Sequence, residues 1–445
     1  MKISYKKTLA ALSMITVGAL TTVSCSATDD GGLKRNADGE IVVDLWHAQS
    51  GDAGNLLDKL VEQFNEEQQG KIEVNAIYQG SYEDNFAKLA ATIQTGNVPT
   101  LMQASDVQTA YMKDSGVTLP MQEALGEQGT EIRNNLLPAV SNYYVMDDEL
   151  WSMPMFVSQP AAYINTDILK KAGVDPNTLV TFDDYLDAAD KIYEVAGTPG
   201  LVFATSAWFN EEFAAGLNQT YCTPGNGVEG ERADGLGFLN DEFYALWGRI
   251  QQGYEKGSIV DVGDSGSDGA ALLTSGNVAM QFNSSGNVTS VQETGIPFTI
   301  RPLPRASEKA GAVPGGNSLW ILKNNKSQEE IDAAAEFAKF VASDGWQERV
   351  LPESGYIPAT KSAAEHTSGL PSQQMALVKN LVETPATTVT AGCHIGAMSQ
   401  IRSEVDTAVQ SVAKGTSPEE AFSKVNEAAE LAIERYETRA AVTEK

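Results

Sequence analysis

Hydrophobic and polar positions in the first part of the chain follow two alternating periods. Short apolar or strictly alternating runs at 41–46, 72–78 and 99–103 predict β-strands. Between them, apolar residues recur at three- and four-residue spacing over 56–64 and 86–93, which predicts two amphipathic helices. The resulting β-α-β-α-β order predicts an α/β domain with a mainly parallel sheet, whose ligands bind beyond the carboxyl ends of the strands.

The same two periods continue through the rest of the chain. A stretch over 151–165 that contains prolines and aromatic residues predicts a strand crossing between two domains. Capping-box sequences begin at Thr181 and Ser327, and predict helices through about Val195 and Val341. The other predicted elements are strands over 201–204, 278–282 and 319–322, and a last helix over about 417–439.

One glycine-containing segment, 391–402, carries a candidate anion site. Helical spacing of apolar residues begins near Ser399, and glycines precede it. Backbone N–H groups at a helix N-terminus favour negative charge, and Arg402 in the first turn offers a planar fork of donors to a phosphate or carboxylate. The alternative is that Arg402 is a surface arginine after an ordinary loop.

Composition and charge narrow the classes of partner. The 445 residues are 42% hydrophobic and 20% charged, which is typical of a soluble globular protein of two domains. The formal net charge of −28 argues against nucleic acid or anionic lipid as a partner. An anionic ligand must therefore be held by local donors against an unfavourable long-range field.

The N-terminus is typical of an exported protein. Three lysines precede the apolar run 9–20, which predicts a signal peptide over 1–24. Cys25 after a small residue resembles the lipidated cysteine of a bacterial lipobox, although Thr22 and Val23 depart from the usual residues there. The polar stretch 25–39 predicts a flexible tether to a lipid anchor. The alternative is an ordinary secretory peptide with an incidental cysteine.

The remaining cysteines and the histidines limit which disulfides, metal sites and catalytic sites the chain can form. Cys222 and Cys393 are able to form one disulfide in an exported protein, but the sequence leaves their pairing open. The histidines, His47, His366 and His394, have no metal-ligand spacing, so we expect neither a metal nor a cofactor. HExxH and Gly-x-Ser-x-Gly motifs are absent from the sequence, which argues against the alternative of a secreted hydrolase.

Several strings, taken in order, resemble the extracellular solute-binding proteins of ABC importers, over about 42–434. In the first half they are Trp46-His47-Ala48, Gly80-Ser81-Tyr82, Gly96-Asn97-Val98-Pro99 and Tyr163-Ile164-Asn165-Thr166. In the second half they are Ser275-Gly276-Asn277-Val278-Ala279-Met280, Gly315-Gly316-Asn317-Ser318-Leu319-Trp320 and Ser354-Gly355-Tyr356-Ile357-Pro358. The resemblance implies a two-lobed periplasmic-binding-protein-like α/β fold, with a ligand cleft between the lobes and crossing hinge strands. The expected lobes are 40–157 plus 302–352 and 158–301 plus 353–438.

Within that family, the string from Gly396 to Arg402 resembles the Gly-x-Met-Pro-Gln-Ile-Arg pattern of the glycerol-3-phosphate-binding branch, with Ser399 in place of the proline. The resemblance implies the ligand residues Tyr82, Asp106, Ser158, Trp208, Ser285, Gly316, Tyr356 and Arg402. Asp106 takes the place of a glutamate and would accept hydrogen bonds from glycerol hydroxyls. Tyr356 and Arg402 would hold the phosphate. The branch has two tryptophans after the 201–204 strand, and this chain keeps only Trp208, with Phe209 beside it.

The resemblance therefore implies a monomeric, lipid-anchored protein that delivers a glycerol phosphate ligand to ABC permease subunits by hinge closure. The missing second tryptophan suggests space for a glycerophosphodiester, such as one bearing choline. The alternative within the family is an oligosaccharide-binding protein of a sugar importer. Such a protein depends on stacked aromatic residues and carboxylates, and has no need of the Arg402 guanidinium.

Overall fold

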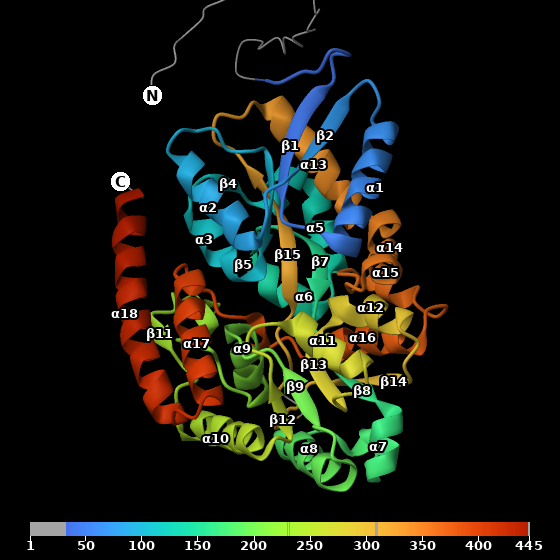
Figure 1. The fold of residues 1–445 in the computed structure, drawn as a ribbon. Coiled ribbons are helices and arrows are strands. Elements are labelled where there is room, and N and C mark those ends of the chain that lie inside the picture. Colours follow the sequence, from blue (N-terminus) through green and yellow to red (C-terminus); the bar gives the residue numbers. More distant parts are fainter. Residues whose placement is uncertain (1–32, 229, 231, 308–309, 444–445) are drawn as a thin grey trace, which may run out of the picture.

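A nearly continuous run of chain joins two β-sheets, and each sheet forms the centre of one lobe (Figure 1). The run consists of β7 (Met153–Ser158) in the first sheet and β8 (Pro160–Asn165) in the second, with Gln159 between them. This confirms the crossing strand predicted over 151–165. The computed structural model describes residues 33–443 apart from 229, 231 and 308–309.

The first lobe has a six-stranded sheet with helices on both faces. Its other strands are β1 (Ile41–His47), β2 (Ile72–Tyr78), β3 (Leu101–Ser105), β4 (Thr118–Leu119) and β15 (Gly315–Leu322). Its helices are α1 (Gly51–Glu67), α2 (Tyr82–Ile93), α3 (Thr109–Asp114), α4 (Met121–Leu125), α5 (Glu127–Asn135), α6 (Pro138–Tyr144), α13 (Gln328–Ala342), α14 (Asp344–Ser354) and α15 (Lys361–Glu365), with a small hairpin of β5 (Val145–Met146) and β6 (Glu149–Leu150).

The expectation of a mainly parallel sheet is wrong. β1 is parallel to β2 and β3, but β15 is antiparallel to β3, β4 and β7. The parallel part is built from local β-α-β units, whereas β7 and β15 carry the chain to and from the second lobe. Strands with that origin are not bound to the parallel direction that a local helical crossover imposes.

Alternation along the strands divides the core of the first lobe between the two faces of its sheet. Met102 and Trp320 pack with α2 and α3 on one face, whereas Leu101 and Ile321 pack with α1 and α13 on the other. Side chains of a strand point to opposite faces in turn, so both faces of this buried sheet need apolar residues. The short apolar run recognised at 99–103 is therefore a strand buried on both sides.

The second lobe has a five-stranded sheet in the order β12-β9-β13-β8-β14. Its other strands are β9 (Leu201–Phe203), β12 (Ile259–Asp261), β13 (Met280–Ser284) and β14 (Phe298–Pro302). Its helices are α7 (Thr166–Ala172), α8 (Phe182–Ala196), α9 (Ala207–Gly216), α10 (Asp241–Lys256), α11 (Gly266–Thr274), α12 (Val288–Glu293), α16 (Ser372–Glu383), α17 (Met398–Ala413) and α18 (Pro418–Thr443), and a small pair of strands is β10 (Cys222–Thr223) with β11 (Gly235–Leu236).

Local capping signals set the helix starts as the sequence predicts. The hydroxyl of Thr181 accepts from the N–H of Asp184, whose carboxylate accepts from the N–H of Thr181 in return, at 3.2 and 2.7 Å. Ser327 and Glu330 form the same reciprocal pair at the start of α13. Each pair satisfies two backbone donors that a helix start leaves without intrahelical partners.

The last helix is longer than predicted and runs along both lobes. α18 continues past the expected end at Arg439 to Thr443, and its C-terminal half lies beside α2 and α3 of the first lobe (Figure 1). The hydroxyl of Tyr436 donates to the carboxylate of Asp114 in α3 at 3.0 Å. α18 therefore adds contacts between the lobes to the segments in which the chain crosses from one lobe to the other.

Part of the predicted tether is packed on the first lobe. Leu33 is buried, Lys34 pairs with Asp44, and Arg35 pairs with Glu329 at 3.0 Å. The stretch 33–39 is thus held by hydrogen bonds rather than free. The predicted signal peptide and Cys25 lie outside the described residues. Within residues 33–443, apart from the gaps named above, no helix is long and apolar enough to cross a membrane.

Candidate ligand-binding site between the lobes

Three of the expected ligand residues meet around Gly315. Asp106 follows β3, Ser158 ends β7, and Trp208 lies in the first turn of α9. A Cβ atom on Gly315 would lie 3.4 Å from Asp106 Oδ2, 3.5 Å from Ser158 Oγ and 3.8 Å from Trp208 Nε1. Because glycine has no side chain, polar atoms from both lobes face one another across this position.

Tyr82 and Tyr356 line a cavity of about 330 Å³ where the first lobe meets the second. Its walls are the turn that begins α1, the start of α2, and Gly286 and Ser290 of the second lobe. The Tyr82 hydroxyl accepts from Gln49 Nε2 at 2.7 Å and from Asn317 Nδ2 at 2.9 Å. Burial raises the pKa of Tyr82 well above its ordinary value, so its hydroxyl keeps the proton and remains a donor.

Asp106 lies beside Gly315, and its charge also acts on Tyr82 and Tyr356 in this cavity. Its side chain is buried and accepts from Ser105 Oγ at 2.7 Å. Burial raises the pKa of Tyr356, and the negative charge of Asp106 adds to the rise. A larger hollow of about 900 Å³ lies on the outer surface of the first lobe, but its lining contains none of the eight expected ligand residues. The space between the lobes is therefore the better candidate site.

Arg402 is paired with a carboxylate that sequence reasoning missed. Its Nε donates to Glu211 Oε1 at 2.5 Å and its Nη2 donates to Glu211 Oε2 at 3.0 Å. Glu211 comes from α9 and Arg402 from α17, and both side chains are largely buried. Such a two-point contact fixes the guanidinium plane as well as its position. Arg402 is thus not an exposed surface arginine, which was the alternative that the sequence left open.

Burial and charge act against each other in this pair. Burial acts to lower the pKa of Arg402, but the carboxylates of Glu211 and Asp106 outweigh it and hold the guanidinium in its charged form. Burial raises the pKa of Glu211, and the charge of Arg402 opposes that rise. The guanidinium therefore favours the charged form of the buried Glu211 carboxyl, whereas Arg402 is charged in any case.

Two further carboxylates surround the pair. Glu212 accepts from the N–H of Val313 at 2.8 Å, and burial raises its pKa well above the ordinary value. Asp406 accepts from the N–H of Ala207 at 2.6 Å and so caps α9. Arg402 is consequently surrounded by acidic side chains whose pKa burial raises, which is an unusual setting for a residue expected to hold a phosphate.

The other two expected residues have clear structural tasks. Ser285 is fully buried, and its Oγ accepts from the N–H of Gln159 at 3.3 Å while its own N–H donates to Gln159 O at 2.9 Å. Gly316 has φ of +108°, and a Cβ there would lie 2.1 Å from the carbonyl oxygen of Phe156. Ser285 thus fixes the crossing point between the lobes, and Gly316 allows β15 to pack against β7.

Two signals in the sequence could have found Glu211. It lies three residues after Trp208, so both project from the same face of a helix. A pair of adjacent glutamates in an otherwise apolar helix is also uncommon unless partners are present. Within the described residues, no group of three or more His, Cys, Asp and Glu side chains is placed to hold a metal ion.

A protein-family model described as bacterial extracellular solute-binding protein matches residues 59–378. The sn-glycerol-3-phosphate-binding periplasmic protein UgpB of Escherichia coli K12 is 28% identical over 422 residues, which cover 91% of this chain and 95% of that protein. UgpB of Shigella flexneri serotype 5b is similar to the same extent.

Solved structures share the two-lobed fold at low sequence identity. UgpB from Mycobacterium tuberculosis, in complex with glycerophosphocholine, superposes with a TM-score of 0.74 at 17% identity and covers 88% of this chain and 99% of that one. The cyclic α-maltosyl-1,6-maltose binding protein of Arthrobacter globiformis gives a TM-score of 0.69 at 17% identity, with 89% and 100% covered. The Thermus thermophilus maltotriose binding protein gives 0.70 at 16% identity, with 88% and 100% covered.

Proposed function

Because the chain belongs to the bacterial extracellular solute-binding proteins, exported components of ABC importers that are not enzymes, we propose that it binds sn-glycerol-3-phosphate or a glycerophosphodiester such as glycerophosphocholine. It delivers this ligand to the permease subunits of the importer. The proposal extends to this chain what the names of its UgpB relatives state of those proteins.

One observation carries the proposal. Arg402 lies between the lobes with its guanidinium fixed, and its Nη1 is left free of the two contacts to Glu211. A phosphate oxygen needs such a charged donor in a chain whose net charge is −28. The hydroxyls of Tyr82 and Tyr356 add neutral donors, while Asp106 accepts from glycerol hydroxyls and Trp208 offers a flat apolar wall.

The connections between the lobes support the proposal of hinge closure. We propose lobes of 40–157 plus 302–365 and of 158–301 plus 366–438, which moves one expected boundary from 352 to 365, with closure about the β7–β8 junction. Ser285 supports this because it bonds both backbone groups of Gln159 at that junction. The packing of α15 on α14 extends the first lobe beyond 352. The proposed mature protein is a monomer, anchored to the outer face of the cytoplasmic membrane through Cys25.

An oligosaccharide is the second candidate ligand, and one observation favours it. Buried carboxylates beside Trp208 are the groups that sugar hydroxyls and sugar faces require, and solved structures of similar fold include maltotriose binders. The two candidates differ in their dependence on Arg402. A phosphate ligand needs its charge, whereas a neutral sugar does not.

Calorimetric titration of the mature protein tests the proposal. Wild type and Arg402→Ala are titrated with sn-glycerol-3-phosphate, glycerophosphocholine and maltotriose. We expect a phosphate ligand to bind wild type and to lose at least about a hundredfold in affinity in the variant, because the charged donor to the phosphate is lost. Arg249→Ala is the control, since Arg249 pairs with surface aspartates of the second lobe. Binding of maltotriose and of neither phosphate ligand would show that the protein binds an oligosaccharide instead.

A further inference from the structure

One face of α9 presents an aromatic ring and a carboxylate to the site. Trp208 and Glu211 are three residues apart, a spacing that places side chains together on a helix. The indole Nε1 of Trp208 lies beside Gly315, close to Asp106 Oδ2, and Glu211 contacts Arg402. Aromatic faces and carboxylates are the groups that hold a quaternary or primary ammonium ion in proteins.

The Glu211–Arg402 contact also limits which phosphates suit the site. Glu211 takes the Nε–Nη2 edge of the guanidinium, the edge that a two-point phosphate contact would use. A phosphate monoester that displaced Glu211 would leave a buried carboxylate without its partner. It would also bring close to two negative charges toward Asp106 and Glu211. A phosphodiester carries one negative charge and needs only the remaining donors.

We propose that Trp208 and Glu211 form a subsite for the cationic head group of a glycerophosphodiester, and that Glu211 makes the protein select such zwitterionic diesters over the phosphate monoester. This rests on the function proposed above and names its substrate class. The phosphate of the ligand lies at Nη1 of Arg402, and its cation lies against Glu211 and Trp208. The negative phosphate then lies beside the positive member of the ion pair, and the positive head group lies beside the negative member.

A comparison of three ligands on the wild-type protein tests the proposal without any substitution. They are glycerophosphocholine, its neutral analogue with carbon in place of the quaternary nitrogen, and sn-glycerol-3-phosphate. The analogue keeps the shape of the head group and removes only its charge. We expect glycerophosphocholine to bind at least about tenfold more tightly than either of the others, the scale of one desolvated charge contact.

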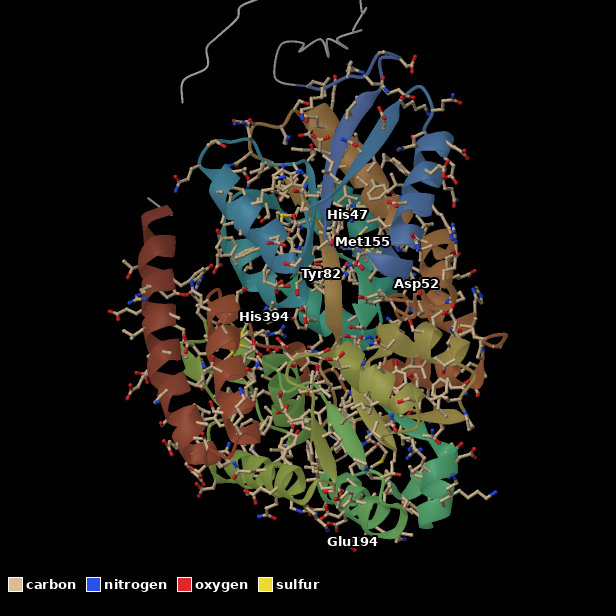
Figure 2. The ribbon with its side chains drawn as sticks, viewed as in Figure 1. His47, Asp52, Tyr82, Met155, Glu194 and His394 are labelled. Carbon is tan, nitrogen blue, oxygen red and sulfur yellow. A yellow bond between two sulfur atoms is a disulfide. The ribbon has the colours of Figure 1, made fainter. Side chains whose placement is uncertain are left out.

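Glu211→Gln tests the residue itself. The amide keeps the size of the side chain and removes its charge, so we expect the affinity for glycerophosphocholine to fall and that for sn-glycerol-3-phosphate to rise. Their ratio should change by at least about tenfold. Glu194→Gln is the matched control, because Glu194 pairs with Lys256 at the far end of the second lobe (Figure 2).

The outcomes separate this inference from the proposed function. Equal binding of glycerophosphocholine and its neutral analogue, or an unchanged ratio in Glu211→Gln, would overturn the cation subsite while leaving a phosphate-binding protein. Failure of all three phosphate ligands to bind the wild type would overturn the proposed function and the subsite with it. If Glu211→Gln does not fold, the wild-type comparison still decides between these outcomes.

Discussion

Cys222 and Cys393, which are 171 residues apart in the sequence, form a disulfide with their Cα atoms 5.6 Å apart. The bridge joins the start of β10 to the segment that leads into α17 and Arg402. Backbone bonds support it, because His394 N–H donates to Asn226 O at 2.9 Å. The pairing that the sequence left open therefore has a location that matters for the site.

Removal of the disulfide should lower stability substantially. We expect Cys222→Ser with Cys393→Ser to reduce the free energy of unfolding by about 3–5 kcal/mol, because a long loop in the unfolded chain is no longer closed. Urea unfolding of wild type and variant under oxidising conditions measures the difference. Wild type in a reductant that opens the bridge is the control and should approach the variant. A loss below about 1 kcal/mol would contradict the prediction.

The adjacent glycines Gly315 and Gly316 should respond differently to alanine. In Gly316→Ala the new Cβ would meet the Phe156 carbonyl oxygen at 2.1 Å with φ of +108°, so we expect a loss of more than about 3 kcal/mol of unfolding free energy. In Gly315→Ala the methyl would make ordinary contacts with Asp106, Ser158 and Trp208.

Gly315→Ala should therefore fold with stability within about 1 kcal/mol of wild type, yet lose at least about tenfold in ligand affinity, because the methyl fills the space between those polar atoms. Thermal unfolding and calorimetric titration of both variants separate the two effects. Unchanged affinity in Gly315→Ala would mean that the ligand does not occupy this space.

His394 should make the protein less stable in acid. Burial lowers its pKa to about 4, from an ordinary 6.5, and its Nδ1 has no hydrogen-bond partner among the described residues. Figure 2 shows it near the level where the two lobes meet. The unfolded chain takes up a proton below about pH 6.5, whereas the folded protein does not until about pH 4. The stability that the neutral ring allows is therefore present above pH 6.5 and lost as the pH falls.

Between pH 7 and 4.5 this single group should cost about 2–3 kcal/mol of unfolding free energy. Urea unfolding of wild type and His394→Gln at the two pH values measures it. The variant should lose less than wild type by that amount. Equal losses in the two proteins would show that the pKa of His394 is the same in the folded protein as in the unfolded chain.

Contacts of Asp114 join the lobes at the side of α18. Its carboxylate accepts from Arg232 Nη2 at 2.7 Å and from Tyr436 at 3.0 Å, and both partners belong to the second lobe. We expect Asp114→Ala to weaken ligand binding by about threefold to tenfold, since hinge closure loses these contacts. Calorimetric titration measures the change.

Asp147→Ala is the control for Asp114→Ala. Asp147 forms an ion pair with Lys113 within the first lobe, so its loss removes a charge from the same region without touching the second lobe. We expect its affinity to equal that of wild type. A similar loss in both variants would assign the effect to general charge rather than to the contacts between the lobes.

Local order along the chain was determined by the sequence. The capping pairs at Thr181 and Ser327, the helix beginning near Ser399 and the crossing stretch over 151–165 all appear where the residues predict them. Each depends on interactions between residues a few positions apart, or on the period of apolar side chains, and such signals are legible without the fold. The family and its two-lobed architecture were likewise recognisable from short strings in order.

The tertiary structure decided what depends on distant partners. The antiparallel direction of β15 departs from the mainly parallel sheet that the first part of the chain predicts, because this strand reaches the first sheet from the other lobe and no local pattern encodes its direction. Arg402 and Glu211 are 191 residues apart, so a residue assigned to a phosphate was found beside a carboxylate. Charge balance in a buried site is a sum over neighbours from several elements, and only the folded chain brings those neighbours together.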